Sequence, residues 1–94
     1  MILSGTPNKA RNNYRKHGVS FEEATTVFRD PKASSICDAK HSEAEDRWIT
    51  LGLSAIGGVL VVHHTFRDIG RSRAIIRIIS SRKATQREIK DYLG

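Results

Sequence analysis

The chain has little of several residue types, and each shortage narrows what the protein can be. Only one of its 94 residues is a cysteine, Cys37, so an internal disulfide is excluded and a reducing compartment is expected. No apolar run approaches the about 20 residues that a membrane span requires. The first residues lack a basic-then-apolar leader, so we expect no export and a cytoplasmic location.

Acidic residues are scarce in the second half of the chain. Residues 1–50 hold eight Lys/Arg and seven Asp/Glu, whereas residues 51–94 hold eight and three, which gives the two halves net charges of +1 and +5. Six of the eight later cations are arginines, whose planar fork of donors matches phosphate. The pattern predicts an anionic partner, either nucleic acid or an acidic protein, although a solvated basic face gives the same count.

Composition and length fit one small domain over residues 1–94. Hydrophobic residues make up 38% and charged residues 28%, as is typical of a globular domain.

Two helices are marked near the start. Thr6 and Pro7 are typical of a helix start, a helix is expected over residues 8–16, and Gly18 follows it as a stop. Ser20 and Glu23 have the spacing of a capping box. The second helix then carries a core-facing stripe of Phe21, Ala24, Val27 and Phe28.

After the second helix, the spacing of apolar residues changes from the helical period to the alternation typical of strands, until a last helix begins near residue 85. Thr85 and Glu88 form a second capping box, which predicts a terminal helix with Ile89, Tyr92 and Leu93 on one side. The sequence therefore predicts an α+β fold with two N-terminal helices, an antiparallel sheet of three or four strands and a C-terminal helix. The expected strands are residues 33–37, 47–53, 59–66 and 73–80, and the last three are joined by loops over residues 54–58 and 67–72.

Arg77 is the most informative single position, because it interrupts a run of four isoleucines. Strand alternation puts it on the face of Ile75 and Ile79, opposite Ile76 and Ile78. A guanidinium cannot be buried unpaired, so this face is expected to open toward water or an anion. The alternative is an ion pair with one of three carboxylates in the polar loop before residue 47: Glu43, Glu45 or Asp46.

Arg82 and Lys83 are expected in the connector between the last strand and the terminal helix. Cations beside a helix N-terminus at Thr85 are typical of a phosphate pocket, although a connector without specific contacts has the same sequence.

The histidines give no clear acid–base pair. His63 and His64 are adjacent in a strand, so they point to opposite faces, and His17 lies in the turn between the first two helices. No spacing around Cys37 matches a zinc signature, so we expect no metal and no cofactor. Nucleophile elbows and glycine-rich phosphate loops are absent as well. RNA cleavage by the substrate's own 2′-hydroxyl remains compatible, because the protein then needs only to position, move protons and stabilise charge.

Several motifs resemble the BrnT family of bacterial type II toxins, and the resemblance covers nearly the whole chain. The two most specific stretches are Lys16-His17-Gly18-Val19-Ser20-Phe21-Glu22-Glu23-Ala24 and Arg77-Ile78-Ile79-Ser80-Ser81-Arg82-Lys83-Ala84-Thr85. Further matches are residues 8–15, Val27-Phe28-Arg29-Asp30-Pro31, His41-Ser42-Glu43, Glu45-Asp46-Arg47-Trp48, Glu88 and Tyr92.

The resemblance implies a RelE-like fold and a metal-independent ribonuclease that inhibits translation. It also implies a BrnA-like ribbon-helix-helix antitoxin that forms a hetero-oligomer with the toxin and alone contacts DNA. Motif matching and the placement of cations make Arg77 and Arg82 the expected stabilisers of phosphate and transition state, with His17 for proton transfer. The expected RNA contacts are Lys83, Arg47, Tyr92, Lys9 and Lys16.

The start of the chain departs from the family pattern. Family members begin with an aromatic–Trp–Asp run, whereas the matching positions here are Leu3-Ser4-Gly5-Thr6. This departure supports an alternative function, a catalytically degenerate toxin fold that binds an antitoxin and modulates operon repression.

Overall fold

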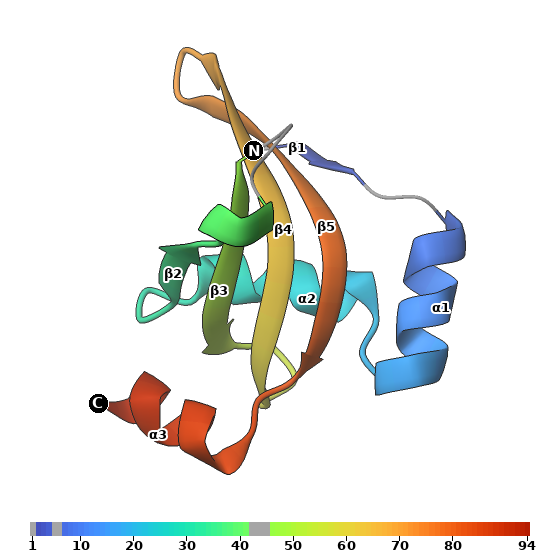
Figure 1. Ribbon diagram of the computed structural model, residues 1–94, viewed down its shortest axis with the longest axis vertical. Helices are drawn as coiled ribbons and strands as arrows, with labels where there is room; N and C mark the ends of the chain where they lie inside the picture. The colour runs from blue at the N-terminus through green and yellow to red at the C-terminus, as the bar shows by residue number, and fades with distance from the viewer. Residues whose placement is uncertain (1, 5–6, 42–45) are drawn as a thin grey trace.

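The computed structural model describes residues 2–4, 7–41 and 46–94. The predicted helix start at Thr6 therefore lies outside the described residues. In chain order the elements are β1 (Ile2–Ser4), α1 (Pro7–His17), α2 (Phe21–Thr26), the 3-10 helix η1 (Val27–Arg29), β2 (Ser34–Cys37), the 3-10 helix η2 (Ala39–His41), β3 (Arg47–Leu53), β4 (Val59–Gly70), β5 (Arg73–Lys83) and α3 (Gln86–Leu93), as Figure 1 shows.

All five strands form one sheet in the order β1-β5-β4-β3-β2. Strands β2 to β5 are antiparallel to their neighbours, and β1 runs parallel to β5 with Ile2 beside Ile75. The α+β class, the two N-terminal helices, the antiparallel four-stranded unit and the C-terminal helix are confirmed. The parallel strand β1 adds a fifth strand, and the RelE-like arrangement stays a prediction.

The predicted loop at residues 67–72 is wrong, because β4 continues to Gly70 and β5 starts at Arg73. Only Arg71 and Ser72 remain in the turn, with φ angles of 52° and 61°. Positive φ at both central residues is the geometry of the two-residue hairpin turn that matches strand twist. The predicted end of the last strand is also wrong: β5 extends to Lys83, so Arg82 and Lys83 lie in the strand and not in a connector.

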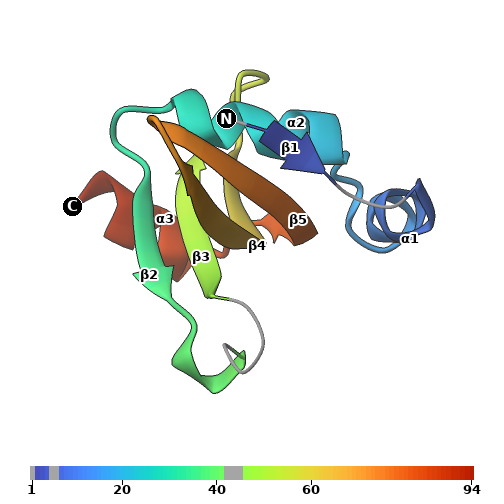
Figure 2. The same cartoon turned by 90° about the horizontal axis from the view of Figure 1, so that it is seen from above.

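One face of the sheet, here the helix face, packs against α2 and η1 and forms the core (Figure 2). The predicted stripe is confirmed, since Phe21, Ala24 and Val27 are buried and Phe28 is partly buried. The close approach of η1 to β3 depends on Gly52, where an added Cβ would lie 2.6 Å from Val27 Cγ1. The remaining buried members of this cluster are Val19, Leu60, Val62 and Ile78.

Helix α1 lies beside the outer edge of β5 and is fixed there by one buried side chain (Figure 1). The Asn13 amide accepts a hydrogen bond from Ser81 N–H and donates one to Ser81 O, each 2.9 Å long. It also donates to Val19 O at 2.9 Å. Strand β1 pairs β5 only at residues 75–77, so this amide satisfies backbone groups of the strand edge further along.

The predicted helix caps are found in the structure. Ser20 Oγ accepts from Glu23 N–H at 3.0 Å, and the capping box of Thr85 and Glu88 at the start of α3 is complete. Glu23 itself accepts from Ser54 Oγ, which joins α2 to the loop after β3. On α3, Ile89 and Tyr92 are partly buried, whereas Leu93 at the end of the helix is 75% exposed.

Candidate active site on the arginine face

The other face of the sheet, here the arginine face, carries Arg47, Arg77 and Arg82. Arg77 and Arg82 are five residues apart, so strict alternation would point them to opposite faces. A bulge prevents this: His63 pairs with Ser80 and the next residue, His64, pairs with Ile78, which leaves one extra residue in β5. The register therefore puts both arginines on one face of the sheet.

The pairing of β3, β4 and β5 then arranges these cations around one histidine. Thr65 pairs with Arg47 on one side and with Arg77 on the other, so the two arginines flank it in a single row. Neighbouring strands lie about 4.8 Å apart, which puts the two Cα atoms roughly 10 Å from each other. His63 is in the next row of the same face, and Arg82, opposite Val61, is in the row after that.

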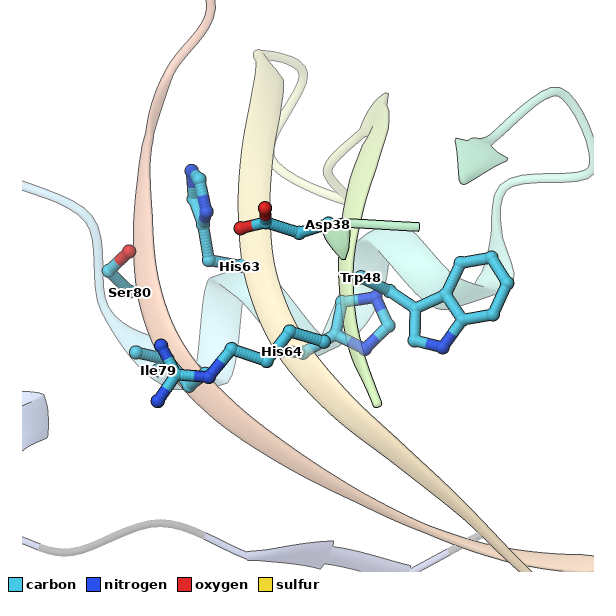
Figure 3. A pocket seen from close by; sticks show the side chains of 7 residues that line it. Asp38, Trp48, His63, His64, Ile79 and Ser80 are labelled. Atoms are coloured by element: carbon cyan, nitrogen blue, oxygen red, sulfur yellow. The ribbon is translucent and has the colours of Figure 1, made fainter. Parts of the chain in front are cut away.

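A pocket of about 160 Å³ lies next to Arg47 and His63 (Figure 3). In Figure 3 the His63 imidazole and the Asp38 carboxylate both project into it from neighbouring elements. Asp38 is held there by its backbone, since its N–H donates to Arg47 O at 2.7 Å. The pocket is lined by Asp38, Arg47, Trp48, His63, His64, Ile79 and Ser80.

The guanidinium of Arg82 is engaged by a carboxylate of α3. Its two terminal nitrogens donate to Glu88 Oε1 and Oε2 at 2.8 and 2.9 Å. Glu88 Oε1 also accepts from Thr85 N–H at 2.8 Å. The hydrogen bonds from Arg82, and then that from Thr85 N–H, lower the pKa of Glu88 to about 2. Arg82 and the Thr85 N–H, the donors expected to bind phosphate at the start of α3, thus bind the Glu88 carboxylate of the protein itself.

Tyr92, an expected RNA contact, makes an internal hydrogen bond. Its hydroxyl donates to Asp30 Oδ2 at 2.5 Å, which connects α3 to the end of η1. Asp30 also accepts from Leu53 N–H and Lys32 N–H. These hydrogen bonds, that of Leu53 first, lower the pKa of Asp30, and the bond to Asp30 raises the pKa of Tyr92.

Of the predicted site residues, Arg47 lines the pocket, whereas Arg77 and Arg82 lie on neighbouring rows of the same face. The remaining ones lie elsewhere. His17 ends α1, beyond the outer edge of β5, and Lys9 and Lys16 are exposed on the same helix (Figure 1). Lys83 is exposed at the end of β5. Of the carboxylates considered as partners of Arg77, Glu43 and Glu45 lie outside the described residues.

His64, in contrast, is buried on the helix face, which confirms that the adjacent histidines point to opposite sides. Its Nε2 lies 2.6 Å from Thr50 Oγ1, its Nδ1 lies 3.1 Å from Thr65 O, and Phe28 packs edge-on against the ring at 4.8 Å. Burial lowers the pKa of His64. The carbonyl can only accept, so Nδ1 carries a proton. When the ring is neutral, Nε2 accepts from the Thr50 hydroxyl, and Thr50 Oγ1, 2.7 Å from Ser35 Oγ, then accepts from that hydroxyl.

The described part of the chain has neither a metal-binding cluster nor a membrane-spanning helix. Among residues 2–4, 7–41 and 46–94, no group of three or more His, Cys, Asp or Glu side chains is placed to hold a metal ion. In the same part of the chain, no helix is both long and apolar enough to cross a membrane.

Comparison with known proteins assigns the chain to a family. Residues 6–88 match the model of a family described as the ribonuclease toxin BrnT of type II toxin–antitoxin systems. The chain belongs to the BrnT family. A search of curated proteins gave no match. As a BrnT toxin the chain is a ribonuclease toxin of a type II system, with RNA as its substrate class and an antitoxin as its partner.

Two pocket residues of this BrnT chain were missed in the sequence. In the sequence, Asp38 is a candidate only for a metal site with Cys37 and His41, which lack the spacing of a zinc signature, and His63 is only one half of an impossible pair. Both belong to the same pocket as Arg47 because of strand register, which the sequence does not contain. The bulge in β5 decides whether Arg77 and Arg82 share a face, and it has no signature in the isoleucine run.

Proposed function

We propose that this BrnT toxin cleaves RNA on its arginine face, through attack of the RNA's own 2′-hydroxyl and without a metal ion. The observation that carries the proposal is one pocket that brings together His63, Asp38 and Arg47, with Arg77 in the adjoining row of the same face. A proton acceptor, a carboxylate and cations are the groups that this reaction needs.

His63 is the general base of the proposed reaction. It accepts the proton of the 2′-hydroxyl, and the 2′-oxygen forms a bond to the adjacent phosphorus. The bond from phosphorus to the 5′-oxygen breaks, and that oxygen leaves as a hydroxyl after taking a proton from water. The products are a 2′,3′-cyclic phosphate and a 5′-hydroxyl end. Asp38, which lines the same pocket as His63, orients the imidazole and stabilises its charged form in this proposal.

Arg47 and Arg77 stabilise the charge that builds on the phosphate. They flank Thr65 from both sides, so a phosphate above that row lies between two guanidinium groups. Planar guanidinium donors bind phosphate oxygens in pairs. Because the negative charge grows in the transition state, such donors accelerate the chemical step as well as binding.

Arg82 is a second phosphate contact in this proposal. RNA binds it only after a phosphate has displaced the Glu88 carboxylate from the Arg82 guanidinium. Because Arg77 flanks Thr65 in the row next to His63, Arg77→Ala should lower activity more than Arg82→Ala. Proton transfer is assigned to His63 in place of His17, because His17 lies on α1 outside the pocket. Lys83, Tyr92, Lys9 and Lys16 are at most peripheral contacts for RNA that extends beyond the pocket.

Cleavage of cellular RNA by this site would inhibit translation, and a BrnA-like ribbon-helix-helix antitoxin would neutralise it in a hetero-oligomer. We expect the antitoxin to cover the arginine face, since that face holds the cations that RNA needs. DNA contact would then come through the antitoxin.

The test combines growth with RNA chemistry. Induced wild type should arrest a bacterial host, and Arg77→Ala should restore growth while the purified variant stays folded. Arg29→Ala, which removes an exposed arginine of η1, is the matched control and should remain toxic. Purified toxin in EDTA should yield 2′,3′-cyclic phosphate ends. Growth arrest that survives Arg77→Ala, or products with 5′-phosphate ends, would contradict the proposal.

The alternative, a degenerate binding module, is favoured by the engagement of Arg82 with Glu88. It predicts tight antitoxin binding by the purified chain while total RNA stays intact under every condition.

A further inference from the structure

The hairpin joining β4 and β5 extends beyond the rest of the sheet. Within the described residues, the last pair between β3 and β4 is Arg47 with Thr65, and β1 pairs β5 up to Ile75. Residues 67–74, here the hairpin arm, therefore project as a two-stranded ribbon (Figure 1). An isolated hairpin is marginal in water and adds little to a core, so its length calls for another explanation.

The arm is basic on the same side as the pocket. Arg67 pairs with Ile75, two residues along β5 from Arg77, and Arg73 is four residues from Arg77 on the same strand. The even spacing puts Arg67 and Arg73 on the arginine face. Asp68, the carboxylate of the arm, falls on the opposite face by the same alternation, and its Oδ1 accepts from Gly70 N–H in the turn.

These cations are exposed and unoccupied by carboxylates. Arg67 and Arg73 are both exposed, and no acidic side chain within residues 2–4, 7–41 and 46–94 pairs with either of them. In this they differ from Arg82, which Glu88 engages. With a strand rise of about 3.3 Å per residue, the rows of Arg67 and Arg73 lie about 7 and 13 Å from the row of Arg77 and Thr65.

We infer that the hairpin arm is an extended RNA subsite, in which Arg67 and Arg73 bind phosphates of the strand that continues beyond the proposed cleavage pocket. The inference rests on the proposed function for the location of the scissile phosphate. An RNA strand is favoured over a protein partner because the two arginines continue the line of Arg77 and Arg47, so one polyanion contacts all four. Salt-dependent phosphate contacts of this kind position the substrate without reading its sequence.

The test measures binding, so that it does not depend on cleavage. Equilibrium affinity is determined for RNAs of about 4 and about 12 nucleotides carrying 2′-O-methyl groups, a length range that matches known single-strand sites. The Arg67→Gln/Arg73→Gln double variant should bind the longer RNA about tenfold more weakly at low salt and bind the shorter RNA as wild type does. Its slope of log affinity against log salt should be smaller in magnitude by about 1.4, since each phosphate contact on a single strand contributes about 0.7.

The matched control is Arg11→Gln/Arg29→Gln, which removes the same charge from exposed positions on α1 and η1. It should bind both RNAs as wild type does. An equal loss in both double variants, or an unchanged salt slope in the arm variant, overturns the inference. So does an arm variant that loses antitoxin binding while keeping full RNA affinity. If wild type binds the longer RNA through the arm yet cleaves no RNA, the proposed function fails and the subsite stands.

Discussion

His63 and His64 show how neighbouring residues of one strand acquire different environments. His64 lies among Phe28, Thr50 and the core, where burial lowers its pKa and Nδ1–H donates to the Thr65 carbonyl. His63 projects to the opposite face, into the pocket with Asp38 (Figure 3). Alternation in the sequence predicts that they separate, but only the packing of η1 and the strand register determine which one is buried.

The buried histidine predicts a loss of stability in mild acid. Its pKa is lowered from 6.5 in the folded state, so between that lowered value and 6.5 the unfolded chain binds more protons. Stability should therefore fall as the pH drops below about 6.5. The measurement is the unfolding midpoint in urea at pH 7.5 and at pH 5.5. His64→Gln should flatten this dependence; a His64→Gln variant that keeps the wild-type dependence would refute the assignment.

Asn13 should be among the most important polar residues for stability. Its amide makes three hydrogen bonds to buried backbone groups of Ser81 and Val19. Asn13→Ala leaves those groups unsatisfied and should lower the free energy of unfolding by about 2–4 kcal/mol. The adjacent exposed residue provides the control, since Asn12→Ala should change it by less than about 0.5 kcal/mol. Equal effects measured by urea unfolding would contradict this role.

At the scale of elements, helices were easier to predict than strand ends. The caps at Ser20 and Thr85 are local patterns, and both give hydrogen bonds where expected. The extension of β4 and β5 depends on a turn at Arg71 and Ser72, which lacks the glycine or asparagine typical of such turns. The bulge in β5 likewise follows from pairing with β4 across the sheet, so no window of sequence reports it.

The packing of η1 on β3 predicts a specific sensitivity at Gly52. A methyl group there meets Val27 Cγ1 at 2.6 Å and Ala33 Cβ at 3.1 Å, so η1 must shift to accommodate it. Gly52→Ala should lower the free energy of unfolding by about 1–3 kcal/mol. Gly58→Ala meets nothing within 4 Å and serves as the control. Thermal unfolding that ranks Gly58→Ala as the more damaging change would show that the contact is not tight.

At the scale of the whole molecule, the sheet separates two tasks. Its helix face buries the core against α2 and η1 (Figures 1 and 2). Its arginine face gathers cations from β3, β4 and β5. The excess positive charge of residues 51–94 predicts an anionic partner but not the histidine and carboxylate that give the face its proposed chemistry. Those residues come together only when β2, β3 and β4 pair.

The most direct test of the central claim is the single-turnover rate constant of RNA cleavage by His63→Gln in EDTA. We expect this rate constant to fall about 100-fold or more relative to wild type, because the 2′-hydroxyl loses its proton acceptor. RNA affinity should stay unchanged, since the arginines that bind phosphate remain. A His63→Gln variant that cleaves RNA within about threefold of the wild-type rate would contradict the account, because a general base contributes far more than that.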